Sequence, residues 1–76
     1  MQIHIGNLSV MTTANQLANL FLPFGQVASS RILASGPKGF STRIGLIEMD
    51  NLRGKLAIKK LNRLLFMNFY IEVEEI

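Results

Sequence analysis

The apolar residues of this chain change their spacing along the sequence in an order that few folds can satisfy. Four segments alternate apolar and polar residues as strands do, the second of them weakly, and two segments repeat at helical spacing. The predicted elements cover residues 2–5, 14–22, 27–34, 42–49, 54–61 and 70–74. Their order is therefore strand, helix, strand, strand, helix, strand.

The first predicted helix has the clearest boundary signals. Thr13 followed by Gln16 fits a capping box, in which two side chains bind the free backbone amides of a helix start. The residues that follow on one helical face are Leu17, Leu20, Phe21 and Phe24. Pro23 and Gly25 are stop signals. We therefore assign the two phenylalanines of this stripe to the core.

Only one face of the predicted sheet can be covered by helices. Two helices with one apolar stripe each cover one side of four strands, which leaves the other side open. The set expected to face the helices is Ile3, Ile5, Ile47, Ile71 and Val73. The set expected on the open face is Gln2, His4, Thr42, Ile44, Leu46, Glu48, Tyr70, Glu72 and Glu74, joined by Arg31 and Leu33. Function is expected on this open face.

Length and charge set further limits. The 76 residues allow one small domain, over residues 1–76, and the absence of cysteine means that its core forms without disulfides. A net charge of +3 permits an anionic partner. The basic side chains of residues 53–63 belong to the second helix, where we interpret them as a solvated helix face.

Several classes of protein are disfavoured. One histidine, no cysteine and a single aspartate, Asp50, provide no catalytic constellation, so we expect neither an enzyme nor a bound metal or cofactor. No apolar run reaches 18 residues, and no charged start precedes a long apolar segment. We therefore expect no membrane partner and a cytoplasmic location.

Three motifs carry a family resemblance. They are residues 3–8 (IHIGNL), 17–25 (LANLFLPFG) and 57–62 (AIKKLN). With the order of elements, they make the chain resemble the RNA recognition motif (RRM) over nearly its whole length. The resemblance implies an α+β fold, a ferredoxin-like βαββαβ sandwich with a four-stranded antiparallel sheet in spatial order 4-1-3-2 and two helices on one face. It also implies that single-stranded RNA is the partner.

The third strand departs from the family pattern. The family octamer reads basic, Gly, aromatic, Gly or Ala, aromatic, Val, any, aromatic. Aligned on Gly45, residues 42–49 read TRIGLIEM, so that Ile44 and Leu46 replace stacking aromatics and Arg43 replaces a glycine. In the first strand, His4 stands at a usually aromatic position and can still stack on a base. Since stacking is worth about 1–3 kcal/mol per base, we predict weak RNA binding.

The resemblance and the open face together predict the site. The predicted RNA-binding residues are His4, Asn7, Arg31, Lys38, Phe40, Arg43, Ile44, Leu46 and Tyr70. The histidine and the two third-strand aliphatics would meet bases, and the three basic residues would meet phosphates. Asn7 and Tyr70 would lie at the margins, and Phe40 is either a loop anchor or a base contact.

Two alternatives to RNA remain open. Glu48, Glu72 and Glu74 would repel phosphates, which favours a protein-protein interaction module that uses the same apolar and acidic sheet face. A small molecule bound near residues 7–11 is a further alternative, supported by the fold alone. We expect a monomer, because contact between the acidic face of one copy and the basic helix of another would be head-to-tail and open-ended.

Overall fold

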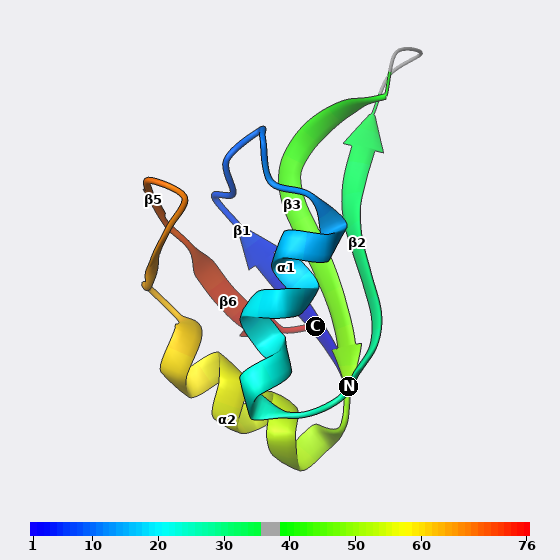
Figure 1. Ribbon diagram of the computed structural model, residues 1–76, viewed down its shortest axis with the longest axis vertical. Coiled ribbons are helices and arrows are strands. Elements are labelled where there is room, and N and C mark those ends of the chain that lie inside the picture. The colour runs from blue at the N-terminus through cyan, green and yellow to red at the C-terminus, as the bar shows by residue number, and fades with distance from the viewer. Residues whose placement is uncertain (36–38) are drawn as a thin grey trace.

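The sheet follows the predicted topology. In the computed structural model, which describes residues 1–35 and 39–76 and the backbone but not the side chain of Phe40, four antiparallel strands lie in the order β2-β3-β1-β6 (Figure 1). The strands are β1 (Gln2–Gly6), β2 (Val27–Ser35), β3 (Phe40–Met49) and β6 (Glu72–Glu75). This order confirms the predicted arrangement of an α+β, ferredoxin-like sandwich.

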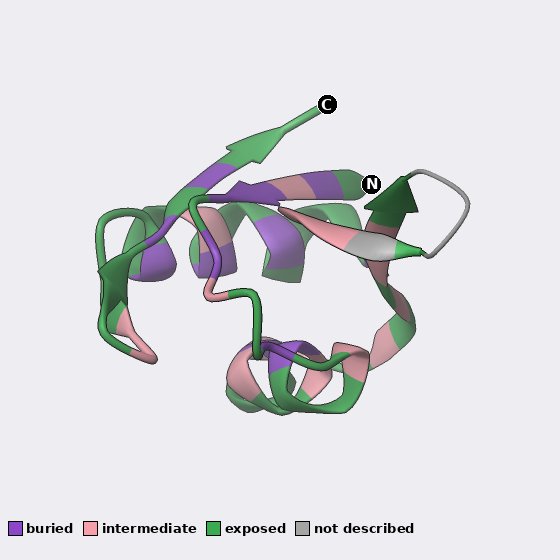
Figure 2. Ribbon diagram, turned by 90° about the horizontal axis from the view of Figure 1, so that it is seen from above, coloured by how far each residue is buried: buried purple, intermediate pink, exposed green. Residues whose placement is uncertain are grey.

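Both helices lie on one side of the sheet (Figure 2). They are α1 (Ala14–Phe21) and α2 (Asn51–Leu61), and the short 3₁₀ helix η1 (Leu22–Phe24) follows α1 directly. The capping box is confirmed, because Gln16 N donates to Thr13 Oγ1 and Thr13 N donates to Gln16 Oε1. Asp50 caps α2 by accepting from Arg53 N. No helix of the described residues lies on the opposite face of the sheet.

The core lies between the sheet and the helices. Its buried apolar residues are Ile3, Ile5, Leu8, Leu17, Phe21, Ile47, Met49, Ala57, Leu61, Ile71 and Val73. All five residues expected to face the helices belong to this set, and half-buried Phe24 packs against it. The period-2 pattern therefore separated the two faces of the sheet correctly.

The segment after α2 differs from the prediction. Instead of one strand over residues 70–74, it forms a small hairpin of β4 (Leu65–Phe66) and β5 (Phe69–Tyr70) before β6 begins. Met67 and Asn68 both have positive φ, 51° and 73°, which a two-residue hairpin loop of this twist requires. Tyr70 therefore pairs with β4 and lies outside the main sheet, which corrects its predicted position.

Candidate functional site

A row of four side chains crosses the open face from one edge strand to the other. The register places Arg31 opposite Leu46, Leu46 opposite His4 and His4 opposite Glu74. The two outer residues are exposed, and the two central ones are half-buried. We call Arg31, Leu46, His4 and Glu74 the central row. It offers an apolar and aromatic centre between a cation and a carboxylate.

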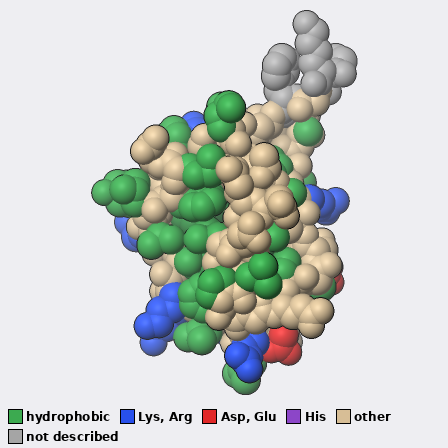
Figure 3. All heavy atoms as spheres, in the orientation of Figure 1, with side chains coloured by type: hydrophobic (Ala, Val, Ile, Leu, Met, Phe, Trp, Pro, Cys, Tyr) green, Lys and Arg blue, Asp and Glu red, His purple; other side chains and the backbone are tan. Residues whose placement is uncertain are grey.

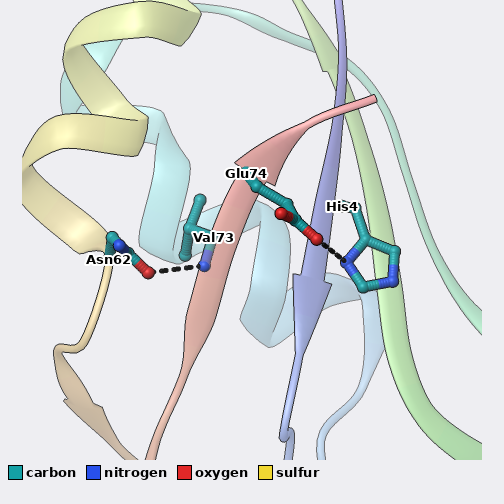
Figure 4. Close-up of polar contacts among 4 residues, drawn as sticks. All are labelled: His4, Asn62, Val73 and Glu74. Atoms are coloured by element: carbon teal, nitrogen blue, oxygen red, sulfur yellow. Dashed lines mark hydrogen bonds and ion pairs between the residues drawn. The ribbon is translucent and has the colours of Figure 1, made fainter.

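His4 lies in the middle of this row. Its Nδ1 is 3.7 Å from Glu74 Oε1 (Figure 4), a distance that suits an ion pair when the imidazole is protonated but is too long for a hydrogen bond. Among the described residues, this buried nitrogen has no hydrogen-bond partner. The ring stays about one-third exposed, so that it can still offer apolar surface to a flat ligand.

The face continues toward the end of β1. Gly45 is buried on the helix side of the sheet. Because successive residues of a strand face opposite sides, its neighbour Ile44 faces the open side, where it is half-buried. A methyl group on Gly6 would lie 3.5 Å from His4 Cε1 and 3.7 Å from Glu72 Oε2. The imidazole and the Glu72 carboxylate therefore both lie beside Gly6, on the open face.

Arg43 has a structural role that the sequence did not reveal. Its Nε donates to the Leu8 carbonyl at 2.7 Å, and its Nη2 donates to Asn7 Oδ1 at 3.3 Å. The guanidinium lies 4.5 Å from the ring centroid of Phe69 in β5, a cation-π contact. Asn7 Nδ2 in turn donates to the Tyr70 carbonyl at 2.9 Å. These contacts connect β3 and the end of β1 to the hairpin. They also engage the Arg43 guanidinium, which the sequence predicted to bind phosphate.

The backbone at Arg43 explains the glycine of the family octamer. Its φ is 64°, in the left-handed region that glycine adopts without steric cost. Arg43→Gly and Arg43→Ala remove the same side-chain contacts, but only alanine keeps the strain, so we expect the glycine variant to be more stable by about 1 kcal/mol. Urea denaturation of both variants measures the difference.

The matched control for this prediction is the neighbouring position. The φ of Thr42 is not positive. Thr42→Ala should therefore be more stable than Thr42→Gly, as at an ordinary strand position. Equal or reversed stabilities of the two Arg43 variants would contradict the backbone explanation.

The remaining predicted site residues are distributed unevenly. Lys38 lies outside the described residues, and for Phe40 only the backbone is described, paired with Ser35. Tyr70 is 65% exposed, on the hairpin. The structure therefore brings His4, Ile44, Leu46 and Arg31 together on the sheet, and Asn7, Arg43 and the Tyr70 backbone in a second cluster at its end.

The basic side chains of α2 belong to the opposite side of the molecule. Lys and Arg gather in the lower part of the surface on the helix side (Figure 3). The exposed basic residues of this helix are Arg53, Lys55, Lys59 and Lys60. They do not extend the central row.

Among residues 1–35 and 39–76, no group of three or more His, Asp or Glu residues is arranged to hold a metal ion. None of the helices in the described part of the chain is long and apolar enough to cross a membrane.

Comparisons with known proteins identify the class to which this sheet and its motifs belong. The model of the RNA recognition motif family matches residues 3–72, which is most of the chain. A comparison with curated proteins finds no significant match. The chain belongs to the RNA recognition motif family.

Solved structures agree with this assignment. A crystal structure of RNA binding protein PG1 is 30% identical, with a TM-score of 0.96, over 100% of this chain and 93% of that chain. RNA recognition domains 1 and 2 of Sex-lethal from Drosophila melanogaster are 23% identical (TM-score 0.88), and the match covers 96% of this chain and 47% of that chain. The Rna15 RRM with bound RNA (GU) is 19% identical (TM-score 0.83), and the match covers 96% of this chain and 79% of that chain. The last two similarities show the fold alone.

Proposed function

We propose that this chain binds single-stranded RNA weakly across the open face of its sheet. The observation that carries the proposal is the central row, which places His4 and Leu46 on the two middle strands with Arg31 at one edge. Membership of the RNA recognition motif family and the likeness to an RNA-bound Rna15 RRM support it. The family is a class of binding domains rather than enzymes, and we propose no catalysis.

The row suggests how RNA would be held. The imidazole of His4 would stack on one base, and the half-buried Leu46 and Ile44 would give apolar contact to neighbouring bases. Exposed Arg31 on β2 would meet a phosphate. Because aliphatic side chains replace two aromatic platforms, each worth about 1–3 kcal/mol per base, the affinity should be low.

The carboxylates on the same face lower the affinity further. Glu48, Glu72 and Glu74 are all exposed and repel phosphates at long range. Their repulsion and the attraction of Arg31 are both screened by salt, but phosphate contacts also release counterions. Net RNA binding should therefore weaken as salt rises.

An NMR titration with short mixed-sequence oligoribonucleotides at low salt tests the proposal. We expect amide shifts centred on His4, Ile44, Leu46 and Arg31, with fast exchange and a dissociation constant that increases with salt. His4→Ala should weaken binding by about 5-fold or more, since it removes the remaining ring. Lys60→Ala, on the helix side, is the control and should have a smaller effect. Shifts confined to residues 55–63 would contradict a site on the sheet.

A protein-docking role for the same face is the second candidate. Two half-buried aliphatics, Ile44 and Leu46, lie among three exposed carboxylates, a composition that suits a basic and apolar protein surface. Absence of shifts with every oligoribonucleotide at low salt would favour this candidate. The monomeric state and the cytoplasmic location predicted from the sequence stay part of the proposal.

A further inference from the structure

The Nδ1 atom of His4 makes a different contact in each charge state of the ring. It is buried, has no hydrogen-bond partner among the described residues and lies 3.7 Å from Glu74 Oε1 (Figure 4). A neutral imidazole carries one N–H. With the proton on Nε2, Nδ1 and the carboxylate are two acceptors that face each other, and with the proton on Nδ1 the distance is too long for a hydrogen bond. A protonated imidazole forms an ion pair with Glu74 at this distance.

The open face is acidic around this histidine. Its other charged groups are Glu72 and Glu74 on β6, Glu48 on β3 and Arg31 on β2. Glu74 lies directly opposite His4, and Glu72 lies beside Gly6, close to the ring. Both helices lie on the other side of the sheet (Figure 2). Among the described residues, three carboxylates against one guanidinium give this face a charge of −2 with a neutral imidazole and of −1 with a protonated one.

This change of charge occurs in an accessible range of pH. Histidine ordinarily gains its proton between pH 5 and pH 8. His4 is the single histidine of the chain, and the chain has no cysteine that would titrate in the same range. Because RNA is a polyanion, a face with one negative charge fewer binds it more tightly.

We propose that RNA binding on the open face is coupled to protonation of His4, so that the affinity increases as the pH falls through the titration of this side chain. The inference rests on the proposed function and adds its regulation. By linkage, RNA binding also takes up protons. The proton acts at the centre of the site, because His4 belongs to the central row and its ring is about one-third exposed. The ion pair with Glu74 would restrict rotation of the ring, which lowers the entropy cost of stacking a base on it.

The experiment measures the affinity for a 5′-hydroxyl oligouridylate by fluorescence anisotropy at constant low salt and at about pH 5.5, 6.5 and 7.5. Neither uracil nor a phosphodiester changes its charge in this range. We expect binding to be about 3- to 10-fold tighter at the lowest pH than at the highest. An affinity that is constant, or that falls with falling pH, would overturn the inference and leave the RNA proposal standing. Absence of binding at every pH would overturn both.

His4→Phe is the matched variant, because it keeps a flat ring that cannot take up a proton. Its affinity should change less than about 1.5-fold over the same range. His4→Gln, which has neither ring nor titration, should also be independent of pH. The salt dependence gives a second measurement: in the original chain, the slope of log affinity against log salt should be steeper at low pH by up to about 0.7, and in His4→Phe the slopes should agree. An unchanged pH dependence in both variants would overturn the inference, because the titrating group would then lie elsewhere, as at the amino group of Met1.

Discussion

Replacing Gly45 with alanine is expected to destabilise the domain by about 1–3 kcal/mol, the usual cost of adding a methyl group to a filled core. Gly45 lies in β3, between β1 and β2, on the helix side of the sheet. A β-carbon there would overlap Leu17 Cδ2 and lie 3.1 Å from Leu8 Cδ1, and both leucines are fully buried. Because these side chains have no space to move into, α1 would have to shift away from the sheet. A lower midpoint of urea denaturation, with unchanged slope, measures the loss.

Gly6 is the matched control, since it lies in the neighbouring strand and its added methyl group would point to the open face. The nearest atoms would be His4 Cε1 at 3.5 Å and Glu72 Oε2 at 3.7 Å, which are ordinary contacts. We expect Gly6→Ala to leave stability within about 0.5 kcal/mol of the original chain. If Gly6→Ala proves as destabilising as Gly45→Ala, the distinction between a packed face and an open face is wrong.

The two faces of the sheet could be predicted because their residues differ strongly in polarity. Ile3 and Ile5 alternate with Gln2 and His4, and a shift of one residue would bury the polar pair. The start of the first helix was readable for a similar reason, because Thr13 and Gln16 have a specific local chemistry at a helix start. Where local chemistry and burial agree, a single sequence is sufficient.

The hairpin after α2 could not be predicted because its loop lacks the usual residues. Two-residue loops of this twist favour Asn-Gly or Asp-Gly, and here the loop is Met67-Asn68. Only Asn68 tolerates positive φ readily, so only one of the two loop residues indicated a turn. The apolar residues before the loop and the alternating residues after it were interpreted as an apolar stretch followed by a single strand. Tyr70 was therefore assigned to the main sheet.

The candidate site was predictable in composition but not in contacts. Alternation placed His4 and Leu46 on one face, but their alignment with Arg31 depends on register, which irregularities between Val27 and Ser29 and between Ile32 and Ala34 set. Phe69 was missed, because its contact with Arg43 follows from the hairpin. Arg63 was assigned to a solvated helix face, because nothing local indicates that the chain after α2 turns toward β6.

Restoring the aromatic residues of the third strand should produce the largest change in RNA affinity. Ile44 and Leu46 are half-buried on the open face, on the strand next to His4. Phenylalanine at either position would add a flat platform worth about 1–3 kcal/mol per stacked base, or roughly 5- to 100-fold in the dissociation constant. The double variant Ile44→Phe/Leu46→Phe should therefore bind oligouridylate at least about 10-fold more tightly than the original chain. Fluorescence anisotropy at fixed low salt measures the gain.

Leu56→Phe is the control for this gain, because the exposed Leu56 of α2 lies on the helix side and offers the same change of side chain away from the open face. It should leave the dissociation constant within about 2-fold, since nonspecific stacking on a lone surface ring has no neighbouring platform. A second measurement separates stacking from charge: phenylalanine adds no cation, so the slope of affinity against salt should stay the same while the affinity rises. An equal gain from Leu56→Phe, or no gain from the double variant while its fold is retained, would show that RNA does not stack on β3 and that the open face serves another partner.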